Sequence, residues 1–294
     1  MHLVSYSKDG VKGLAFRKGS DLIDLKGCEL SGLLEAGEAG FKHAAHLALY
    51  GPLVDESSLS YLPPIAAPPK IVCVGLNYKD HVNEAKRAAP SDPTFFGRFT
   101  RSVIGHGQTL IRPSASEQFD YEGEIAAVIG KGGRHISREQ ALDHVAGYSV
   151  FNDASVRDYQ RRGEQWTLGK NFDSTGAFGP DFVTADELPA GARGLRLVTR
   201  LNGVEVQSAT AEDMIFDVAT LIVRLSEVMT LEVGDVIVTG TPGGVGFARV
   251  PKLFMKDGDV CEVELEGVGT LRNPVKDETA PRSTPQRKDL VDAR

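Results

Sequence analysis

Three carboxylates stand in a pattern that folding alone does not require. Glu122 and Glu124 flank Gly123 at the start of an apolar, strand-like run, so their side chains point to one face. Two like charges entering a buried strand repel each other and lose hydration unless a cation or a proton compensates them. Asp153 ends a second strand-like run, and a neighbouring strand would bring it to the same point. Three carboxylates without Cys or His nearby predict an oxygen-only site for Mg²⁺, Mn²⁺ or Ca²⁺.

The alternative is that this Glu-Gly-Glu pattern is an ordinary solvated strand face, since short motifs match by chance. A second candidate pair is His81 and Glu84, which lie three apart in a run of helical composition and would share one helix face. The simpler interpretation is a surface pair worth a few tenths of a kcal/mol. Because glycine and proline breaks flank this segment, we predict that it acts as a mobile lid.

Two glycine-rich loops follow later in the chain. The first, residues 171–180, is preceded by the only tryptophan, Trp166, and by Lys170, which suit either a site or simple packing. The second, residues 240–246, follows a strand-like run, so its backbone is able to approach an oxyanion. No Lys-Ser/Thr pair follows it, which leaves a nucleotide P-loop unsupported and a tight structural loop as the alternative.

Composition narrows the class of protein. The 294 residues carry 33 Lys and Arg against 40 Asp and Glu, a net charge of −7, which argues against a nucleic-acid partner. No apolar run approaches the ~18 residues that span a bilayer, and the first residues lack a basic region followed by an apolar one. We therefore expect a cytoplasmic protein without a membrane partner. The three cysteines lie far apart and predict reduced packing residues rather than disulfides or a zinc site.

Strand-like and proline-rich stretches divide the chain. Short predicted strands separated by glycines make residues 1–65 a small N-terminal domain. A proline cluster at 63–69 ends this domain, because consecutive prolines exclude helix and remove sheet donors. Residues 70–276 carry every candidate chemical residue and form the predicted catalytic domain. Residues 277–294 are polar and proline-dotted, which predicts a loosely ordered tail.

Five motifs, taken in order, resemble the fumarylacetoacetate hydrolase family. The first three are Gly75-Leu76-Asn77-Tyr78 with His81 and Glu84, Glu122-Gly123-Glu124, and Asn152-Asp153. The last two are Leu168-Gly169-Lys170 with Asp173 and Gly179-Pro180, and Thr239-Gly240-Thr241-Pro242 with 244–246. Any one of these motifs is weak evidence, whereas five in the family's order over residues 70–276 are specific.

This resemblance implies an α+β, predominantly β fold, a mixed β-sandwich roll with a small N-terminal domain, commonly assembled as a homodimer. It also implies a divalent metal held by Glu122, Glu124 and Asp153, which we expect to be Mg²⁺, with Mn²⁺ as an alternative and Ca²⁺ as a structural substitute. Arg98 stands where many relatives have a lysine. We expect the substrate to be bound by four residues: Arg98, Tyr78, Gly240 and Thr241.

We expect hydrolytic cleavage of a carbon–carbon bond in a 2,4-dioxo acid, such as an acylpyruvate or a sugar-derived diketo acid, releasing pyruvate or a related 2-oxo acid. In this hypothesis His81 activates water, Glu84 orients the imidazole, and Lys170 faces the developing negative charge. Members of the family that resemble this chain also decarboxylate oxaloacetate or isomerise acids such as 2-hydroxyhepta-2,4-diene-1,7-dioate. These two reactions remain alternatives, as does a metal-stabilised binding protein without activity.

Overall fold

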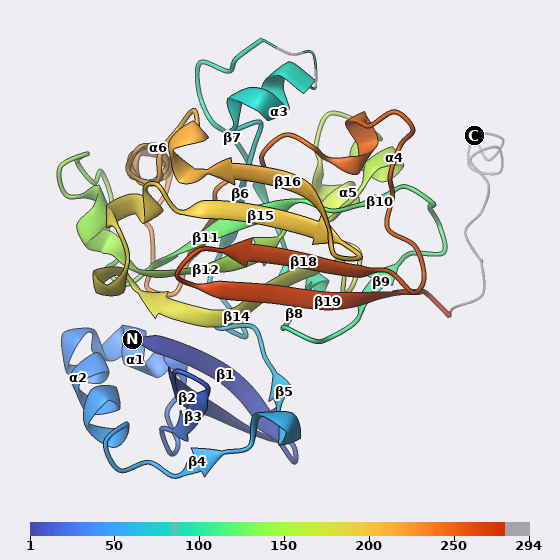
Figure 1. Ribbon diagram of the computed structural model, residues 1–294. Coiled ribbons are helices and arrows are strands. Elements are labelled where there is room, and N and C mark those ends of the chain that lie inside the picture. The colour runs from blue at the N-terminus through green and yellow to red at the C-terminus, as the bar shows by residue number, and fades with distance from the viewer. Residues whose placement is uncertain (85, 87, 280–294) are drawn as a thin grey trace, which may run out of the picture.

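Two β-sheets packed face to face form the larger part of the structure, which is a computed structural model describing residues 1–84, 86 and 88–279 (Figure 1). The larger sheet mixes parallel and antiparallel pairs. Its strands lie in this order: β4 (Leu53–Val54), β3 (Asp21–Asp24), β2 (Val11–Lys18), β1 (His2–Lys8), β14 (Gly176–Thr184), β12 (Val145–Asn152), β11 (Gly123–Ile129), β17 (Val236–Val238), β6 (Ile71–Gly75) and β7 (Thr94–Gly97). Two short strands extend it, since β5 (Ser60–Tyr61) pairs with β1 and β8 (Val103–Ile104) with β14.

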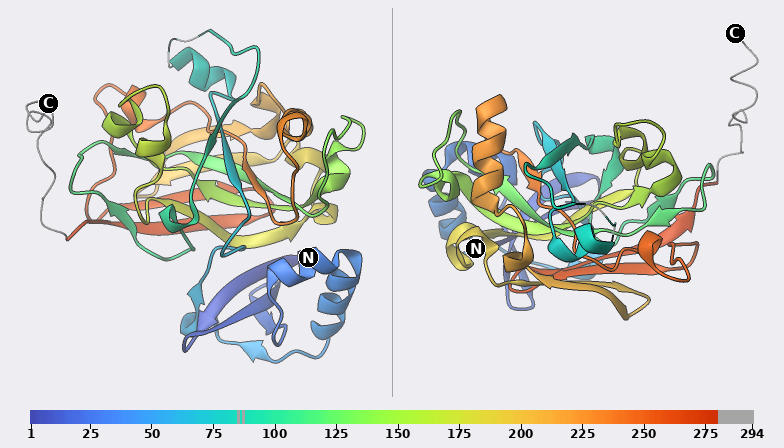
Figure 2. Two further views of the ribbon diagram at one scale, coloured as in Figure 1. Left: turned by 180° about the vertical axis from the view of Figure 1, so that it is seen from behind. Right: turned by 90° about the horizontal axis from the view of Figure 1, so that it is seen from above.

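The second sheet has five strands and lies in front of β11 and β12 in Figure 1. Its strands are β16 (Val204–Thr210), β15 (Arg196–Leu201), β18 (Val260–Leu265), β19 (Gly269–Asp277) and β9 (Leu110–Arg112). Buried residues alternate along β18, as expected of a strand with one face on the core. Every residue of β11 is buried, because this strand lies inside the larger sheet and is covered on both faces. The view from above in Figure 2 shows the two layers.

Helices are few and short. They are α1 (Leu30–Ala36), α2 (Glu38–Leu47), α3 (Lys79–Glu84), α4 (Arg157–Gln160), α5 (Thr167–Lys170) and α6 (Val218–Val228). The Asp217 side chain accepts from the Thr220 N–H and so begins α6. A two-strand ladder of β10 (Phe119–Asp120) and β13 (Ser155–Val156) supports the site. No helix of the described residues is long and apolar enough to cross a membrane. The fold is α+β and predominantly β, which confirms the predicted class.

The N-terminal residues form the lower part of the molecule in Figure 1 and contain the strands that the sequence predicts. Strand β1 also pairs with β14, with Leu3 opposite Phe182, so the larger sheet continues across the predicted domain boundary. Leu3 and Leu14 share one apolar cluster with Phe178 and Phe182. The boundary near residue 65 therefore divides the chain without dividing the hydrogen-bonded sheet. Most of the predicted C-terminal tail, residues 280–294, lies outside the described residues.

Candidate active site

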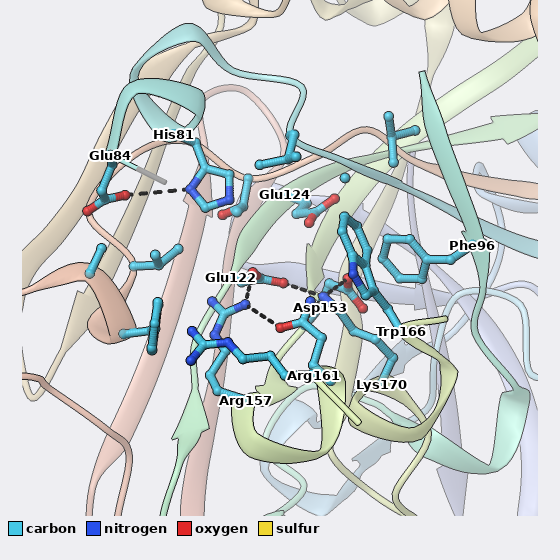
Figure 3. A pocket seen from close by; sticks show the side chains of 18 of the residues that line it. His81, Glu84, Phe96, Glu122, Glu124, Asp153, Arg157, Arg161, Trp166 and Lys170 are labelled. Carbon is cyan, nitrogen blue, oxygen red and sulfur yellow. Dashed lines mark hydrogen bonds and ion pairs between the residues drawn. The ribbon is translucent and has the colours of Figure 1, made fainter. Parts of the chain in front are cut away.

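A cavity of about 440 Å³ opens between the acidic ends of β11 and β12 and the lid helix α3 (Figure 3). Glu122, Glu124 and Asp153 form its inner end, while His81 and Glu84 of α3 face them across the space. The cavity therefore brings together the three predicted metal ligands and the predicted His-Glu pair. Its walls carry Val74, Phe96, Trp166, Val245 and Phe247.

The ladder between β11 and β12 aligns the three carboxylates. Gly123 lies opposite Asn152, and the Asp153 N–H donates to the Glu122 carbonyl at 2.8 Å. Gly123 faces the second sheet, where an added Cβ would lie 2.1 Å from Oγ1 of Thr199. Only glycine allows this approach, and Glu122 and Glu124 on either side then point the other way, into the cavity.

One ligand oxygen from each of Glu122, Glu124 and Asp153 lies within 4.8 Å of the other two. All three residues are at least 96 % buried. Burial raises the pKa of Glu124 well above its ordinary value, and the nearby charges of Asp153 and Glu122 add to this effect. Within the described part of the chain, Glu124 accepts only the Gly240 N–H, at 2.5 Å. A divalent cation would offset this repulsion, so the residues fit an oxygen-coordinated metal.

Lys170 lies between two of the carboxylates and is 2 % exposed. Its ammonium group donates to Oε2 of Glu122, to Oδ2 of Asp153 at 2.5 Å and to the Asp153 carbonyl at 3.1 Å. Although burial alone would lower the pKa of Lys170, the charges of Asp153 and Glu122 raise it. This lysine therefore stays charged at the inner end of the cavity, where its three hydrogen bonds go to oxygens of Glu122 and Asp153.

Arg98 lies behind the metal ligands rather than in the cavity. Its buried guanidinium pairs with Oδ1 of Asp153 and donates to Thr175 at 2.9 Å and Ser102 at 3.0 Å. The position expected to contact substrate thus holds a side chain that fixes the orientation of Asp153. A planar group with several donors suits this position because it satisfies several acceptors at once.

The other predicted substrate contacts are also placed differently. The Tyr78 hydroxyl is buried, and burial raises the pKa of Tyr78. The Gly240 amide already donates to Glu124. Thr241 lines the cavity, but its hydroxyl donates to the Gly123 carbonyl at 3.0 Å and accepts from Gln207 at 2.8 Å. Of these three residues only Thr241 lines the cavity.

Hydrogen bonds hold both ends of the short helix α3, the segment that the sequence predicts to act as a lid. The Asn77 side chain donates to the carbonyls of Thr239 and Phe216, at 2.7 and 2.9 Å, and fixes the start of α3. The Glu84 carboxylate accepts from the Gly244 N–H at 3.1 Å. His81 Nδ1 lies 3.5 Å from Oε2 of Glu84, and among the described residues this buried nitrogen makes no hydrogen bond.

Arg157 is a site residue that the sequence pattern did not identify. Its Nε donates to Asp120 at 2.8 Å, and its Nη1 lies 2.7 Å from Oε1 of Glu122. Burial alone would raise the pKa of Glu122, but the charges of Arg157 and Lys170 hold it well below its ordinary value. Arg157 lines the cavity, and its Nη2 is buried without a hydrogen-bond partner among the described residues. The sequence feature that could have identified Arg157 is its position four residues after Asp153.

Two further residues missed from the sequence line the cavity beyond Arg157. Gln160 accepts from Arg157 at 3.0 Å, and the Arg161 guanidinium carbon lies 3.6 Å from the centre of the Phe247 ring. Trp166 packs on Gly75, where a Cβ would lie 2.0 Å from the indole, and edge-on against Phe96. The run 160–166 carries no motif, so only the fold brings these residues to the site.

Fold and site together define a β-roll protein with three buried carboxylates that could hold a divalent metal, beside a cavity with an imidazole, an ammonium and a guanidinium. The sequence profile described as "Fumarylacetoacetate (FAA) hydrolase C-terminal" matches residues 70–276. The chain belongs to the fumarylacetoacetate hydrolase family, and its members are enzymes.

Among its relatives, "Oxaloacetate tautomerase fahd2, mitochondrial" of Xenopus laevis is 39 % identical over 272 residues, which cover 90 % of this chain and 85 % of the relative. A fumarylacetoacetate hydrolase from psychrophilic Exiguobacterium antarcticum matches the structure with a TM-score of 0.84 and 34 % identity, covering 95 % of this chain and all of that one. A maleylpyruvate hydrolase from Sphingobium sp. SYK-6, solved with manganese(II) and pyruvate, matches with a TM-score of 0.80 and 26 % identity over the same shares of the two chains.

Proposed function

We propose that the chain catalyses keto–enol tautomerisation of a 2-oxo acid of the oxaloacetate type. The observation that best supports this proposal is the position of His81. This residue faces the acidic cluster from across the cavity, while Glu84 is held by the Gly244 amide. Tautomerisation moves one proton between the carbon next to the keto group and the keto oxygen. A single imidazole beside a charge-stabilising site supplies what this reaction needs.

Glu122, Glu124 and Asp153 would hold the divalent cation, and we expect Mg²⁺ or Mn²⁺. When bound, such a cation polarises a keto oxygen and orients a 2-oxo acid. Lys170 and the Nη2 group of Arg157 supply positive charge and a donor on the same side. Their role is to stabilise the negative charge that develops on oxygen as the carbon loses its proton.

His81 would move the proton. With Nδ1 directed to Glu84, the neutral imidazole keeps its lone pair on Nε2, and Nε2 takes a proton from the carbon next to the keto group. Returning that proton to oxygen gives the enol, and returning it to carbon restores the keto form. Glu84 stabilises the imidazolium between these two steps, and such a base contributes on the order of 10²–10⁴-fold.

The test follows the ultraviolet absorbance of enol-oxaloacetate in the presence of Mg²⁺. Wild-type protein is expected to accelerate its decay to the keto form, and His81→Ala to remove most of that acceleration. The names of the most similar relatives support this choice of substrate. No acceleration of oxaloacetate interconversion by wild-type protein would refute it.

Hydrolysis of a 2,4-dioxo acid is the second candidate, because the same His81 and Glu84 pair suits activation of water. It is supported by the maleylpyruvate hydrolase with the same fold. Here Nε2 of His81 would take a proton from water, and the resulting hydroxide would attack the carbonyl at C4. The C3–C4 bond would then break, its electron pair would pass to the enolate of the 2-oxo acid, and His81 would return the proton to that enolate. Acylpyruvates assayed in ¹⁸O-labelled water would then give label in the released carboxylic acid. Loss of carbon dioxide alone would indicate a decarboxylase instead, and no turnover a binding protein.

We also propose that the chain works as a homodimer in the cytoplasm, as the sequence led us to expect. The Xenopus laevis relative named above is described as mitochondrial. Sedimentation analysis tests the dimer, and fractionation of the native cell tests the compartment.

A further inference from the structure

The glycine loop 240–246 is the surface on which the lid helix α3 rests. A Cβ on Gly243 would lie 3.2 Å from Cβ of Asp80, so the loop backbone packs directly on the first turn of α3. At the next residue, the Gly244 N–H donates to both carboxylate oxygens of Glu84, at 3.2 and 3.1 Å. The position of Gly244 therefore sets where the Glu84 carboxylate lies.

Gly244 is itself held from its other side. Its carbonyl oxygen accepts from Nε of Arg249 and from the Tyr121 hydroxyl, both at 3.0 Å. Nη2 of Arg249 also donates to the Val206 carbonyl of β16, the edge strand of the second sheet. A Cβ on Gly244 would lie 2.2 Å from that Val206 oxygen, and the φ of Gly244 is +101°, so only glycine suits this position. Arg249 therefore ties Gly244 to the second sheet.

These contacts connect the second sheet to the proposed base. Within the described part of the chain, Glu84 accepts hydrogen bonds only from the Gly244 N–H. Oε2 of Glu84 in turn lies 3.5 Å from Nδ1 of His81 (Figure 3). Since one amide anchors the carboxylate, a displacement of Gly244 would move Glu84 away from the imidazole.

We propose that Arg249 is a positioning residue of the active site, which acts through Gly244 on Glu84. This inference rests on the proposed function, in which Glu84 orients His81 and stabilises its imidazolium. Neither Arg249 nor Tyr121 lines the cavity, so both act on the reaction through the loop. A guanidinium suits this position because its planar set of donors reaches two carbonyl oxygens at once.

The first experiment follows oxaloacetate interconversion with Mg²⁺ present. Arg249→Met removes both donors, and we expect kcat to fall roughly 10-fold, a part of what a general base contributes, with KM within about twofold of wild type. Arg249→Lys keeps a cationic donor and should restore kcat to within about threefold of wild type. Tyr121→Phe removes the other donor to the Gly244 carbonyl and should lower kcat by a smaller factor. This conservative variant carries the test if Arg249→Met does not fold.

A double-variant cycle separates positioning from a general loss of structure. In a Glu84→Ala background Gly244 has no carboxylate to hold, so adding Arg249→Met should change kcat by less than about twofold. Losses that multiply in the double variant would overturn the inference. Wild-type kcat in both Arg249→Met and Tyr121→Phe would overturn it too.

An NMR measurement tests the same contact without turnover. The ring nitrogens of ¹⁵N-labelled histidine report the environment of His81, whose signals are those missing from His81→Gln. Arg249→Met should shift these signals toward their values in Glu84→Ala. Signals that stay at their wild-type values would refute the role of Arg249. If wild-type protein does not interconvert oxaloacetate, the proposed function fails, and this spectrum still decides whether Arg249 positions Glu84.

Arg200→Met is the matched control. Arg200 is partly exposed, pairs with Glu264 at 2.6 Å on the second sheet and lies outside the cavity lining. This variant also removes a guanidinium from its partner, but no described contact links it to the glycine loop. It should therefore keep the wild-type kcat and the wild-type His81 signals. The same losses in Arg200→Met as in Arg249→Met would show a nonspecific effect and overturn the inference.

Discussion

Replacing Glu124 by Gln tests the metal site most directly. The side chain keeps its shape and loses its charge, and the Gly240 N–H still has an oxygen to meet. In wild-type protein an ionised Glu124 places a third negative charge close to Glu122 and Asp153, and this repulsion contributes to its raised pKa. We therefore expect the variant without metal to be at least as stable as the wild type, and to lose the stabilisation that Mg²⁺ provides.

The size of the effect follows from mass action. Mg²⁺ at 100 times its Kd stabilises the folded protein by about 2.7 kcal/mol. With an unfolding entropy of ~2.1 cal/mol/K per residue, 294 residues give about 0.6 kcal/mol per degree. Wild-type protein should gain roughly 4–5 °C in Tm, and Glu124→Gln roughly 1 °C or less at the same Mg²⁺ concentration.

The pH dependence of the Mg²⁺-induced stabilisation distinguishes binding at Glu124 from a nonspecific effect of ions on stability. Because the pKa of Glu124 is raised in the folded protein, the metal-free fold binds more protons than the unfolded chain, and its stability falls as pH rises above the ordinary carboxyl range. Metal binding must expel that proton, so Mg²⁺ affinity rises tenfold per pH unit below the raised pKa. This equals 1.36 kcal/mol, or about 2 °C, per unit.

The assay is differential scanning fluorimetry between about pH 5.5 and 8, with and without Mg²⁺, on both proteins. Each protein is measured at a fixed Mg²⁺ concentration across the pH series. If Glu124→Gln kept both the wild-type Mg²⁺ shift and its pH slope, the metal would lie elsewhere and the reasoning would be refuted.

Three further outcomes are expected. Arg98→Met removes one of the two buried cations that pair with Asp153, leaving Lys170, and should cost about 3–5 kcal/mol in urea unfolding. Arg101→Met breaks a surface pair 3.2 Å from Asp173 and should change stability by less than about 1 kcal/mol; equal effects would count against the buried pair. His81→Ala should lower kcat by about 10²–10⁴-fold and leave the Mg²⁺ shift in Tm intact; unchanged turnover would return His81 to a surface role. Burial lowers the pKa of His106, so wild-type stability should fall as pH drops below 6.5, the ordinary histidine value, and His106→Gln should flatten that slope in scans from pH 7 to 5.

Local patterns predicted the acidic cluster because its cause is local. A two-residue spacing places Glu122 and Glu124 on one strand face, and Asp153 ends the strand that pairs with theirs. The hairpin of β15 and β16 was readable from Asn202-Gly203 for the same reason. In both cases the short spacing fixes which side chains meet.

Contacts between residues that are far apart in the chain could not be predicted from the sequence. The larger sheet extends into the N-terminal residues through β1 and β14, which are far apart in the chain and carry no signal of partnership. We expected Arg98 to contact the substrate because the sequence shows that this residue is charged but does not show that it is buried. Arg157 and Arg161 follow Asp153 at helical spacing, but only the tertiary contacts of Arg157 with Asp120 and of Arg161 with Phe247 place both at the cavity.

The buried cations explain how three carboxylates remain together before a metal binds. Arg98 and Lys170 neutralise Asp153, and Lys170 and Arg157 neutralise Glu122, which leaves Glu124 as the carboxylate with the raised pKa. A divalent cation bound beside Glu124 would supply the positive charge that Arg98, Lys170 and Arg157 give to the other two carboxylates. The fold therefore places its own positive charge beside Glu122 and Asp153 and leaves Glu124 for a divalent cation, which would keep coordination positions open for the proposed anionic substrate.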